Sequence, residues 1–151
     1  MASLSRSNIR VFRFFASLYG AQMEFWLSHP EEYWAGFDSL IDTIEQFNLS
    51  AIPSLGYCMT DSANAALGLN ETINDCVRNT SSGGFRLQVK FYSEIVTRYV
   101  GRRGVLAWEL GNELNNIVNL HSGGPCGPDK CFNTSEMVAH TTRLVDVIKG
   151  M

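Results

Sequence analysis

Hydrophobic residues along the chain fall into two kinds of pattern that alternate with each other. Short apolar runs at 9–15, 49–56 and 105–110 predict strands, because runs of this length are typical of strands covered on both faces. Apolar side chains at helical spacing predict amphipathic helices over residues 33–47, 85–99 and 137–148. The predicted order is therefore strand, helix, strand, helix, strand, helix.

Capping residues support the predicted helix ends. Ser28 with Glu31 forms a capping-box pattern before the first helix, and Asn133 with Glu136 forms one before the last. Gly101 follows the second helix and favours its end there. The stretch between the second strand and the second helix has no comparable periodicity, so we expect a long loop.

Strands that alternate with helices in this way pair in parallel through right-handed crossovers. The fold class is therefore α/β, either a doubly wound sheet or a (β/α)8 barrel. No G-x-G-x-x-G follows the first strand and no G-x-x-x-x-G-K-S/T is present, so the sequence offers no cradle for nucleotide phosphates. We expect no cofactor.

Composition narrows the classes of partner. The 151 residues are 45% hydrophobic and 11% aromatic, enough for one globular domain with a sizeable core. A net charge of -3 with scattered Lys and Arg disfavours nucleic acid as a partner. No apolar run approaches the roughly twenty residues that cross a bilayer, so we expect no membrane partner.

The four cysteines lie in stretches rich in Gly, Pro, Asn and Asp, which favours disulfide bonds between loops: Cys58, Cys76, Cys126 and Cys131. Proximity in the sequence favours the pairs 58–76 and 126–131, although four cysteines allow three pairings. A metal site with His121 or His140 is the minor alternative, because the C-x4-C spacing is not the C-x2-C spacing usual for zinc. We expect no metal.

Four Asn-x-Ser/Thr sequons, at Asn48, Asn70, Asn79 and Asn133, indicate glycosylation and, with the cysteines, secretion. The first twenty residues do not form a signal peptide, because Arg10 and Arg13 interrupt the apolar segment that a leader requires. We therefore expect an extracellular protein whose signal peptide is not present in this chain.

The third apolar run ends in Trp108-Glu109-Leu110-Gly111-Asn112-Glu113 and continues into a polar loop. In α/β barrels the catalytic groups lie at the carboxyl ends of strands, and Glu113 comes shortly after the carboxyl end of this predicted strand. Trp108 and Asn112 would give this carboxyl apolar and amide neighbours able to raise its pKa. Without a family motif, a surface acid that caps the loop is the preferred interpretation of Glu113.

The segment FYSEIVTRYVGRRGVLAWELGNE resembles the helix and fourth strand of clan A glycoside hydrolases, particularly family 5. Its W-E-L-x-N-E strand is similar to that of the endo-β-mannanase-like enzymes. The resemblance implies that Glu113 is the general acid/base, that Asn112 binds the sugar 2-hydroxyl, and that Glu109 is a structural acid of the barrel interior. It implies a partial (β/α)8 TIM barrel, roughly strands 2 to 4 with helices 2 to 4, and residues 1–151 as a partial catalytic domain truncated at both ends.

The same family carries an arginine near the end of the second strand that supports the nucleophile electrostatically. RFFAS resembles that place, which assigns the role to Arg13. Arg10 is the alternative, and because the two are three residues apart, only one points into the site. A purely structural pairing of Arg13 with a barrel acid such as Glu109 is an equal alternative. Further substrate-binding residues are expected at Trp26, in a loop after the first strand, at Trp108, and at His121, in the loop beyond Glu113.

A retaining glycosidase needs two carboxyl groups about 5 Å apart. The resemblance puts the second, the nucleophile, on strand seven, outside this chain; Asp61 is the least implausible substitute. Leu114 departs from the proline common after N-E in the family. Because a complete barrel needs about 250 residues, we expect the missing C-terminal half of the barrel, or a second copy, as a partner.

The expected substrate is a β-linked polysaccharide or oligosaccharide, mannan first and β-glucan second. The resemblance leaves these two open, because the residues that distinguish mannose from glucose are expected in the missing part. The hypothesis from another class is an inactive fragment or a carbohydrate-binding module derived from the barrel. Such a module predicts binding of oligosaccharides without turnover.

Overall fold

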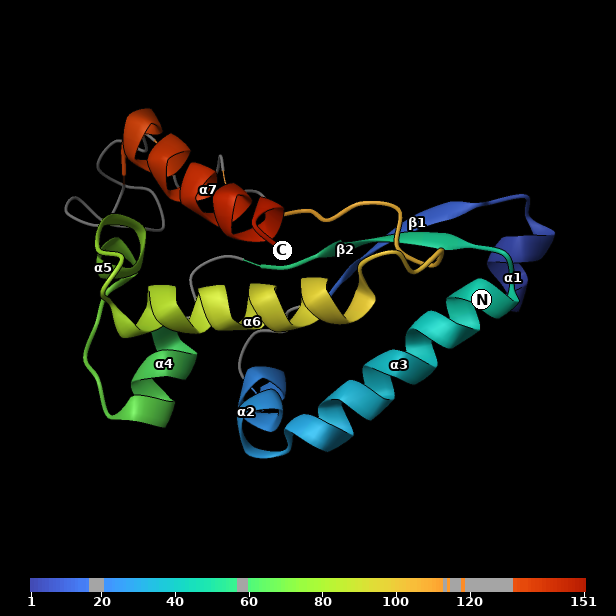
Figure 1. Cartoon of the computed structure of the whole chain (residues 1–151), viewed down its shortest axis with the longest axis horizontal. Helices are drawn as coiled ribbons and strands as arrows, with labels where there is room; N and C mark the ends of the chain where they lie inside the picture. The colour runs from blue at the N-terminus through green and yellow to red at the C-terminus, as the bar shows by residue number, and fades with distance from the viewer. Residues whose placement is uncertain (17–20, 57–59, 113, 115–117, 119–131) are drawn as a thin grey trace. The chain divides into compact units, whose positions relative to one another are not determined.

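The computed structural model describes residues 1–16, 21–56, 60–112, 114, 118 and 132–151 (Figure 1). The chain divides into two compact units, and each is considered by itself. Unit 1 comprises Met1–Gly56 with Tyr99–Glu109, and unit 2 comprises Tyr57–Arg98 with Leu110–Met151. The α/β class is confirmed: the described residues form helices and one parallel pair of strands, without a complete barrel.

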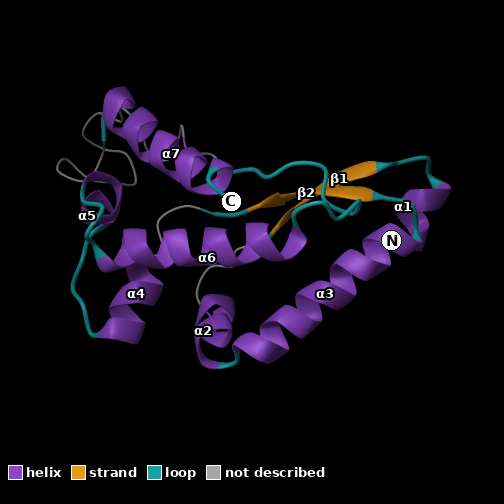
Figure 2. Ribbon diagram, viewed as in Figure 1, coloured by secondary structure: helices purple, strands orange, loops and turns teal. Residues whose placement is uncertain are grey.

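Unit 1 contains the parallel sheet. Its elements follow in the order α1 (Ala2–Arg6), β1 (Val11–Phe15), α2 (Ala21–Ser28), α3 (Pro30–Gln46) and β2 (Ser50–Ser54). The two strands pair in parallel with Val11 opposite Ser50 and Phe15 opposite Ser54, as Figure 2 shows for the two adjacent arrows. The predicted strands at 9–15 and 49–56 are therefore confirmed, with shorter bounds.

The third predicted strand, 105–110, is only partly regular. It runs parallel to β2 and meets it at two isolated bridges, Ala51 with Val105 and Ser54 with Glu109. The two bridged residues are three positions apart in β2 but four positions apart in this segment. The segment therefore contains one extra residue between the bridges, as in a β-bulge. The segment continues the parallel pattern without forming a full strand.

The two faces of the sheet have different surroundings. Ala51 is fully buried, and the Phe14 ring lies 5.9 Å from the Phe37 ring of α3, so this face packs against that helix. Val11, Arg13 and Phe15 alternate with Phe14 and lie on the other face, where Val11 and Phe15 remain exposed. The expectation that this strand is covered on both faces is wrong for the described residues, because only α3 covers it.

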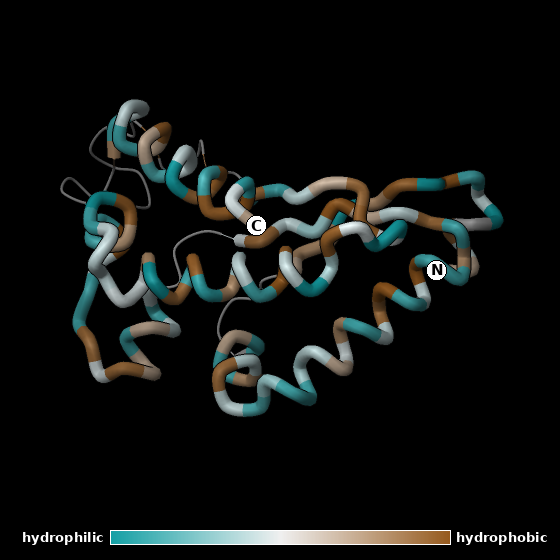
Figure 3. The backbone as a smooth tube through the Cα atoms, viewed as in Figure 1, coloured by the Kyte–Doolittle hydropathy of each residue, from teal (hydrophilic) through white to brown (hydrophobic). Residues whose placement is uncertain are grey.

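Helix α3 forms where the periodicity predicts, but its start is capped differently. Five side chains of one stripe are buried, namely Tyr33, Trp34, Phe37, Ile41 and Ile44, and Figure 3 shows hydrophobic and hydrophilic stretches alternating along the helix. The helix begins at Pro30, with His29 as its N-cap and no side-chain cap hydrogen bond. The Ser28 capping box is wrong, because Ser28 ends α2 and its hydroxyl donates to the Glu24 carbonyl at 2.7 Å.

Residues 99–104 are held against α3 by an aromatic contact and an ion-pair network. The Tyr99 ring lies 5.0 Å from Phe37, and its hydroxyl donates to Asp38 at 2.9 Å. Arg102 donates to Asp42 at 2.6 Å and to both Glu45 oxygens at 3.0 and 3.1 Å. The hydrogen bonds from Arg102 and from the Gly104 main chain hold the pKa of Glu45 below its ordinary value.

Unit 2 is helical: α4 (Thr60–Leu67), α5 (Ile73–Arg78), α6 (Gly83–Tyr99, whose last residue belongs to unit 1) and α7 (Thr134–Lys149). The Asn133–Glu136 capping box of α7 is confirmed, with both reciprocal hydrogen bonds present. Helix α6 begins where the Glu71 carboxylate accepts from the main-chain nitrogens of Gly83 and Gly84, at 2.7 and 2.9 Å.

Four helices of the described residues, α1, α2, α4 and α5, are absent from the sequence-based expectation. Helices α4 and α5 occupy most of the predicted long loop, and α2 lies where a loop after the first strand was expected. Helix α5 has only six residues and starts at a capping box of Thr72 with Asp75, so its apolar repeat is too short to stand out. No helix in the described ranges has the length and apolar character needed to span a membrane.

Shortening a buried side chain of α3 will destabilise unit 1. Ile44 is fully buried, and Ile44→Ala is expected to lower the free energy of unfolding by about 2–5 kcal/mol through lost transfer energy and a residual cavity. All three tryptophans of the sequence, Trp26, Trp34 and Trp108, belong to unit 1, so tryptophan fluorescence in a urea titration reports on this unit. The control Val100→Ala, at a side chain that is 70% exposed, should change the free energy of unfolding by less than about 0.5 kcal/mol.

Candidate active site

The carboxyl ends of the parallel strands bring together an arginine, a serine and a glutamate. The Arg13 Nε donates to Glu109 Oε2 at 2.6 Å, and Arg13 Nη2 donates to Ser54 Oγ at 3.4 Å. Register explains the meeting, because Phe15 lies opposite Ser54 and Ser54 lies opposite Glu109. Arg13 is two residues before Phe15, so its side chain emerges on the same face, away from α3.

This geometry distinguishes the two candidate arginines. Arg13 lies in β1, and its guanidinium also lies 4.9 Å from the centre of the Phe15 ring. Arg10 precedes the strand, and its exposed side chain donates to Asn8 at 3.5 Å. Arg13 is therefore the arginine whose guanidinium reaches Ser54 and Glu109.

Glu109 is held as an anion. Burial raises its pKa, but hydrogen bonds from Ser54 and Arg13, together with the Arg13 charge, outweigh burial and leave the pKa below its ordinary value. A carboxyl with a lowered pKa is a poor proton donor near neutral pH. Glu109 is therefore suited to orient Arg13 rather than to protonate a leaving group.

The segment after Glu109 is anchored in unit 2 by a buried hydrogen-bond chain. Tyr92 of α6 is fully buried, accepts from Gln88 Nε2 at 3.2 Å and donates its hydroxyl to the Leu110 carbonyl. The sequence places Tyr92 on the buried stripe of its helix but gives no signal for the partner of its hydroxyl. This bond holds the chain two residues before Asn112, whose side chain is half-buried.

The predicted acid/base, Glu113, lies outside the described residues, as do His121, Cys58, Cys126 and Cys131. Their roles and the disulfide pairings stay predictions. Cys76 lies in α5 rather than in the loop that the sequence suggested, where it is fully buried with its Sγ 3.8 Å from Gln88 Oε1.

The structure also shows the surroundings of two aromatic candidates and one histidine, and it corrects the prediction for one of them. Trp26 lies in α2 and is 1% exposed, so the loop expected for it is wrong, and a ring so buried has no face to offer a sugar. Trp108, next to Glu109, is half-buried. His140 is buried in α7, and its ring lies 5.7 Å from that of Phe85.

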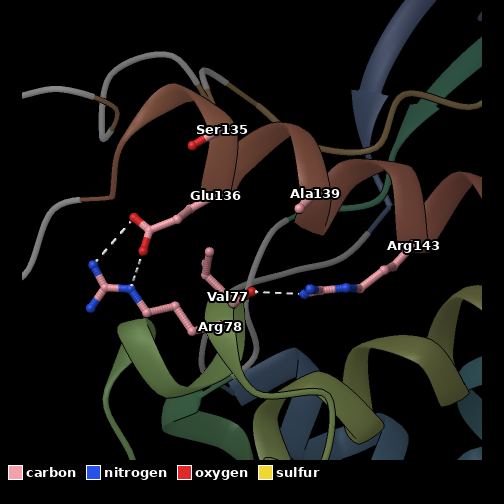
Figure 4. Close-up of a pocket in the computed structure, with 6 residues that line it drawn as sticks. All are labelled: Val77, Arg78, Ser135, Glu136, Ala139 and Arg143. Carbon is pink, nitrogen blue, oxygen red and sulfur yellow. Dashed lines mark hydrogen bonds and ion pairs between the residues drawn. The ribbon is translucent and has the colours of Figure 1, made fainter.

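A cavity of about 360 Å³ lies between α5 and α7 in unit 2 (Figure 4). It is lined by Val77, Arg78, Ser135, Glu136, Ala139 and Arg143. The Arg78 Nε donates to Glu136 at 2.7 Å, and Arg143 donates to the Val77 carbonyl at 3.3 Å. Because its single carboxylate is already paired, this cavity lacks the two carboxyl groups that glycoside hydrolysis needs.

No group of three or more His, Cys, Asp or Glu side chains suited to a metal ion occurs among the residues described by the structure. The metal alternative of the sequence required Cys126 and Cys131, which lie outside these residues. The described chemistry at the strand ends is therefore that of one ion pair and one hydroxyl.

The Arg13–Glu109 pair predicts a specific pH dependence. Because the folded-state pKa of Glu109 is lowered, the pair stabilises unit 1 above the ordinary glutamate pKa, and this contribution is lost as the pH falls through the lowered value. Arg13→Gln should raise the pKa of Glu109, measured by NMR titration of its side chain. Both side chains are over a third exposed, at 38% and 36%, so the loss of stability at neutral pH should stay below about 1 kcal/mol.

A Glu109 titration that is unaffected by Arg13→Gln would contradict the assigned ion pair. Glu32→Gln, which changes an exposed glutamate of α3, is the control and should leave the titration of Glu109 unchanged.

Comparison with known proteins adds no family assignment. No protein-family model matches the chain, and the search of curated proteins finds no match. Assignment of a reaction therefore depends on the W-E-L-x-N-E motif and on the geometry of the strand ends.

Proposed function

We propose that this chain is part of a secreted retaining glycoside hydrolase that cleaves a β-linked polysaccharide, mannan first and β-glucan second. The observation that carries the proposal is the Arg13–Glu109 ion pair at the carboxyl ends of parallel strands, at 2.6 Å. Catalytic groups of α/β barrels occupy this end of their strands. Asn112 and Glu113 follow Glu109 by three and four residues, where the motif puts the sugar-binding amide and the acid/base.

The exposed face of the sheet supports the proposal of a partial barrel. Val11 and Phe15 are 42% and 41% exposed on the side away from α3. Leu106, next to the bridged Val105 and so pointing to this same side, is 59% exposed. Parallel sheets are covered on both faces, and inside a barrel the inner face is filled by side chains from the other strands. We propose that further strands cover this face in the complete enzyme.

In the proposed mechanism Glu113 donates a proton to the glycosidic oxygen and later takes one from the attacking water. Asn112 binds the 2-hydroxyl of the sugar at the cleavage point. Glu109, being an ion-paired anion, keeps Arg13 at the strand ends, where a cation supports a neighbouring carboxylate nucleophile.

The proposed nucleophile belongs to the strands that complete the barrel. Asp61, the substitute within this chain, lies in the first turn of α4 with an exposed side chain, and thus not at a strand end. The proposal therefore gives this chain the acid/base but not the carboxylate that forms the glycosyl intermediate.

The second candidate function is carbohydrate binding without turnover. The exposed Phe15 ring beside Arg13 favours it, because an aromatic side chain with an adjacent cation and carboxylate presents both a stacking surface and hydrogen-bonding groups to a sugar. A binding module needs no second carboxylate.

Hydrolysis of β-mannan and cellulose oligomers, measured as new reducing ends, tests the proposal in the enzyme completed by the strands that supply the nucleophile. Glu113→Gln should lower the rate by about 10²-fold or more, because the leaving oxygen is no longer protonated. Asp61→Asn is the matched control and should leave the rate unchanged. An unaffected rate in Glu113→Gln would remove the assignment of the acid.

The absence of a nucleophile can be tested with the purified chain by adding azide. A chain with the acid but without the nucleophile should convert a β-mannooligosaccharide to the α-glycosyl azide by direct displacement, and Glu113→Gln should abolish this product. Measurable sugar binding with neither reducing ends nor glycosyl azide would favour the binding module instead.

A further inference from the structure

The asparagines of all four sequons are exposed, namely Asn48, Asn70, Asn79 and Asn133. The side-chain nitrogen of asparagine is the atom that carries an N-linked sugar, so in the folded protein this side chain must be accessible to solvent. In the part of the chain that the structure describes, none of these four nitrogens makes a hydrogen bond. Exposure and an unengaged nitrogen therefore occur together at every sequon.

At Asn79 the side chain is oriented by its oxygen. Asn79 is the C-cap of α5, and its Oδ1 accepts from the Ser81 main-chain nitrogen at 2.9 Å. This is an Asx-turn, in which the amide oxygen is used by the local backbone. The side-chain nitrogen of this exposed residue makes no hydrogen bond among the described residues.

At Asn133, which lies at the start of a helix, the side-chain oxygen likewise accepts the hydrogen bonds and the nitrogen makes none within the described part of the chain. The Oδ1 accepts from the Glu136 main-chain nitrogen at 2.9 Å and from the Ser135 hydroxyl at 2.5 Å, which caps α7. An N-linked sugar leaves the amide carbonyl in place, because only a hydrogen on Nδ2 is replaced. The cap and a glycan are therefore compatible on one side chain.

The two asparagines belong to the same end of the α5–α7 pair. The Arg78–Glu136 ion pair, at 2.7 Å, joins the residue before Asn79 to the first turn that Asn133 caps (Figure 4). Asn48 and Asn70 have exposed side chains as well, but no side-chain hydrogen bond orients them among the described residues, so the inference is confined to Asn79 and Asn133.

We propose that Asn79 and Asn133 carry N-linked oligosaccharides, so that this end of α5 and α7 faces solvent in the mature protein. The donor is an oligosaccharide linked to a polyprenyl pyrophosphate. The bond from its sugar C1 to the pyrophosphate oxygen breaks, a bond from C1 to Nδ2 forms, the amide loses one proton to solvent, and the lipid pyrophosphate leaves. The proposal rests on the secretory location proposed above but is independent of the hydrolytic activity.

The test is to produce the full chain behind a cleavable leader in a eukaryotic secretory host and to digest it with peptide N-glycosidase. The enzyme should lower the mass of the chain and convert Asn79 and Asn133 to aspartate, which peptide mass spectrometry identifies. Each of Asn79→Asp and Asn133→Asp should abolish one of these glycans. Both variants keep the oxygen that the turn or the cap requires, so the folded structure should persist.

A second pair of variants separates the glycan from the asparagine itself. Ser81→Ala and Ser135→Ala remove the sequon hydroxyl while leaving Asn79 and Asn133 in place, and each should abolish the same glycan as the corresponding asparagine variant. If the host retains the chain instead of secreting it, the chain can be translated in the presence of microsomes. The presence or absence of each glycan is then measured on the translocated chain, whether or not that chain folds.

Unmodified Asn79 and Asn133 in the translocated chain would overturn the proposal, as would glycans that persist in the serine variants. Neither result bears on hydrolysis, because loss of the mannan-cleaving activity in Glu113→Gln is measured without reference to glycans. Failure of the hydrolase proposal and failure of the glycan proposal are therefore distinguishable.

Discussion

Parallel pairing to the two edges of β2 determines where the functional groups of unit 1 lie. β1 pairs along one edge, and residues 105–109 meet the other edge at two bridges. Because all three segments run in the same direction, their carboxyl ends meet, and Arg13 reaches Glu109 across nearly a hundred residues of chain. The single extra residue before Glu109 turns its side chain to the face that Arg13 occupies.

In the proposed mechanism the two glutamates of the W-E-L-x-N-E motif have different roles, and the surroundings of Glu109 explain its role. Glu109 has an arginine and a serine hydroxyl as partners, and its pKa is lowered, so it serves as an anion. An acid/base needs the opposite, a carboxyl that holds its proton near neutral pH. The proposal gives that role to Glu113, four residues later in the chain.

Asparagine side chains recur at the ends of helices in unit 2, and their two polar atoms have different uses. In Asn79 and Asn133 the oxygen completes a turn or a cap, which secures α5 and α7 beside the Arg78–Glu136 ion pair. The nitrogen contributes nothing to those bonds and stays available. Local stability and modification therefore do not compete at these residues.

The sequence by itself determined the elements whose signal is a local repeat. These are strands β1 and β2, the long helices α3, α6 and α7, and the Asn133–Glu136 cap, because spacing and capping depend only on neighbours in the chain. It also singled out Arg13 and Glu109 through the family resemblance of RFFAS and of the W-E-L-x-N-E motif. Tertiary structure alone decided the burial of Trp26 within α2, the short helices α4 and α5, the replacement of the Ser28 cap by a bond to Glu24, and the partner of the Tyr92 hydroxyl. Register and coverage are set by segments far apart in the chain, and a periodicity does not report which distant segment will lie against it.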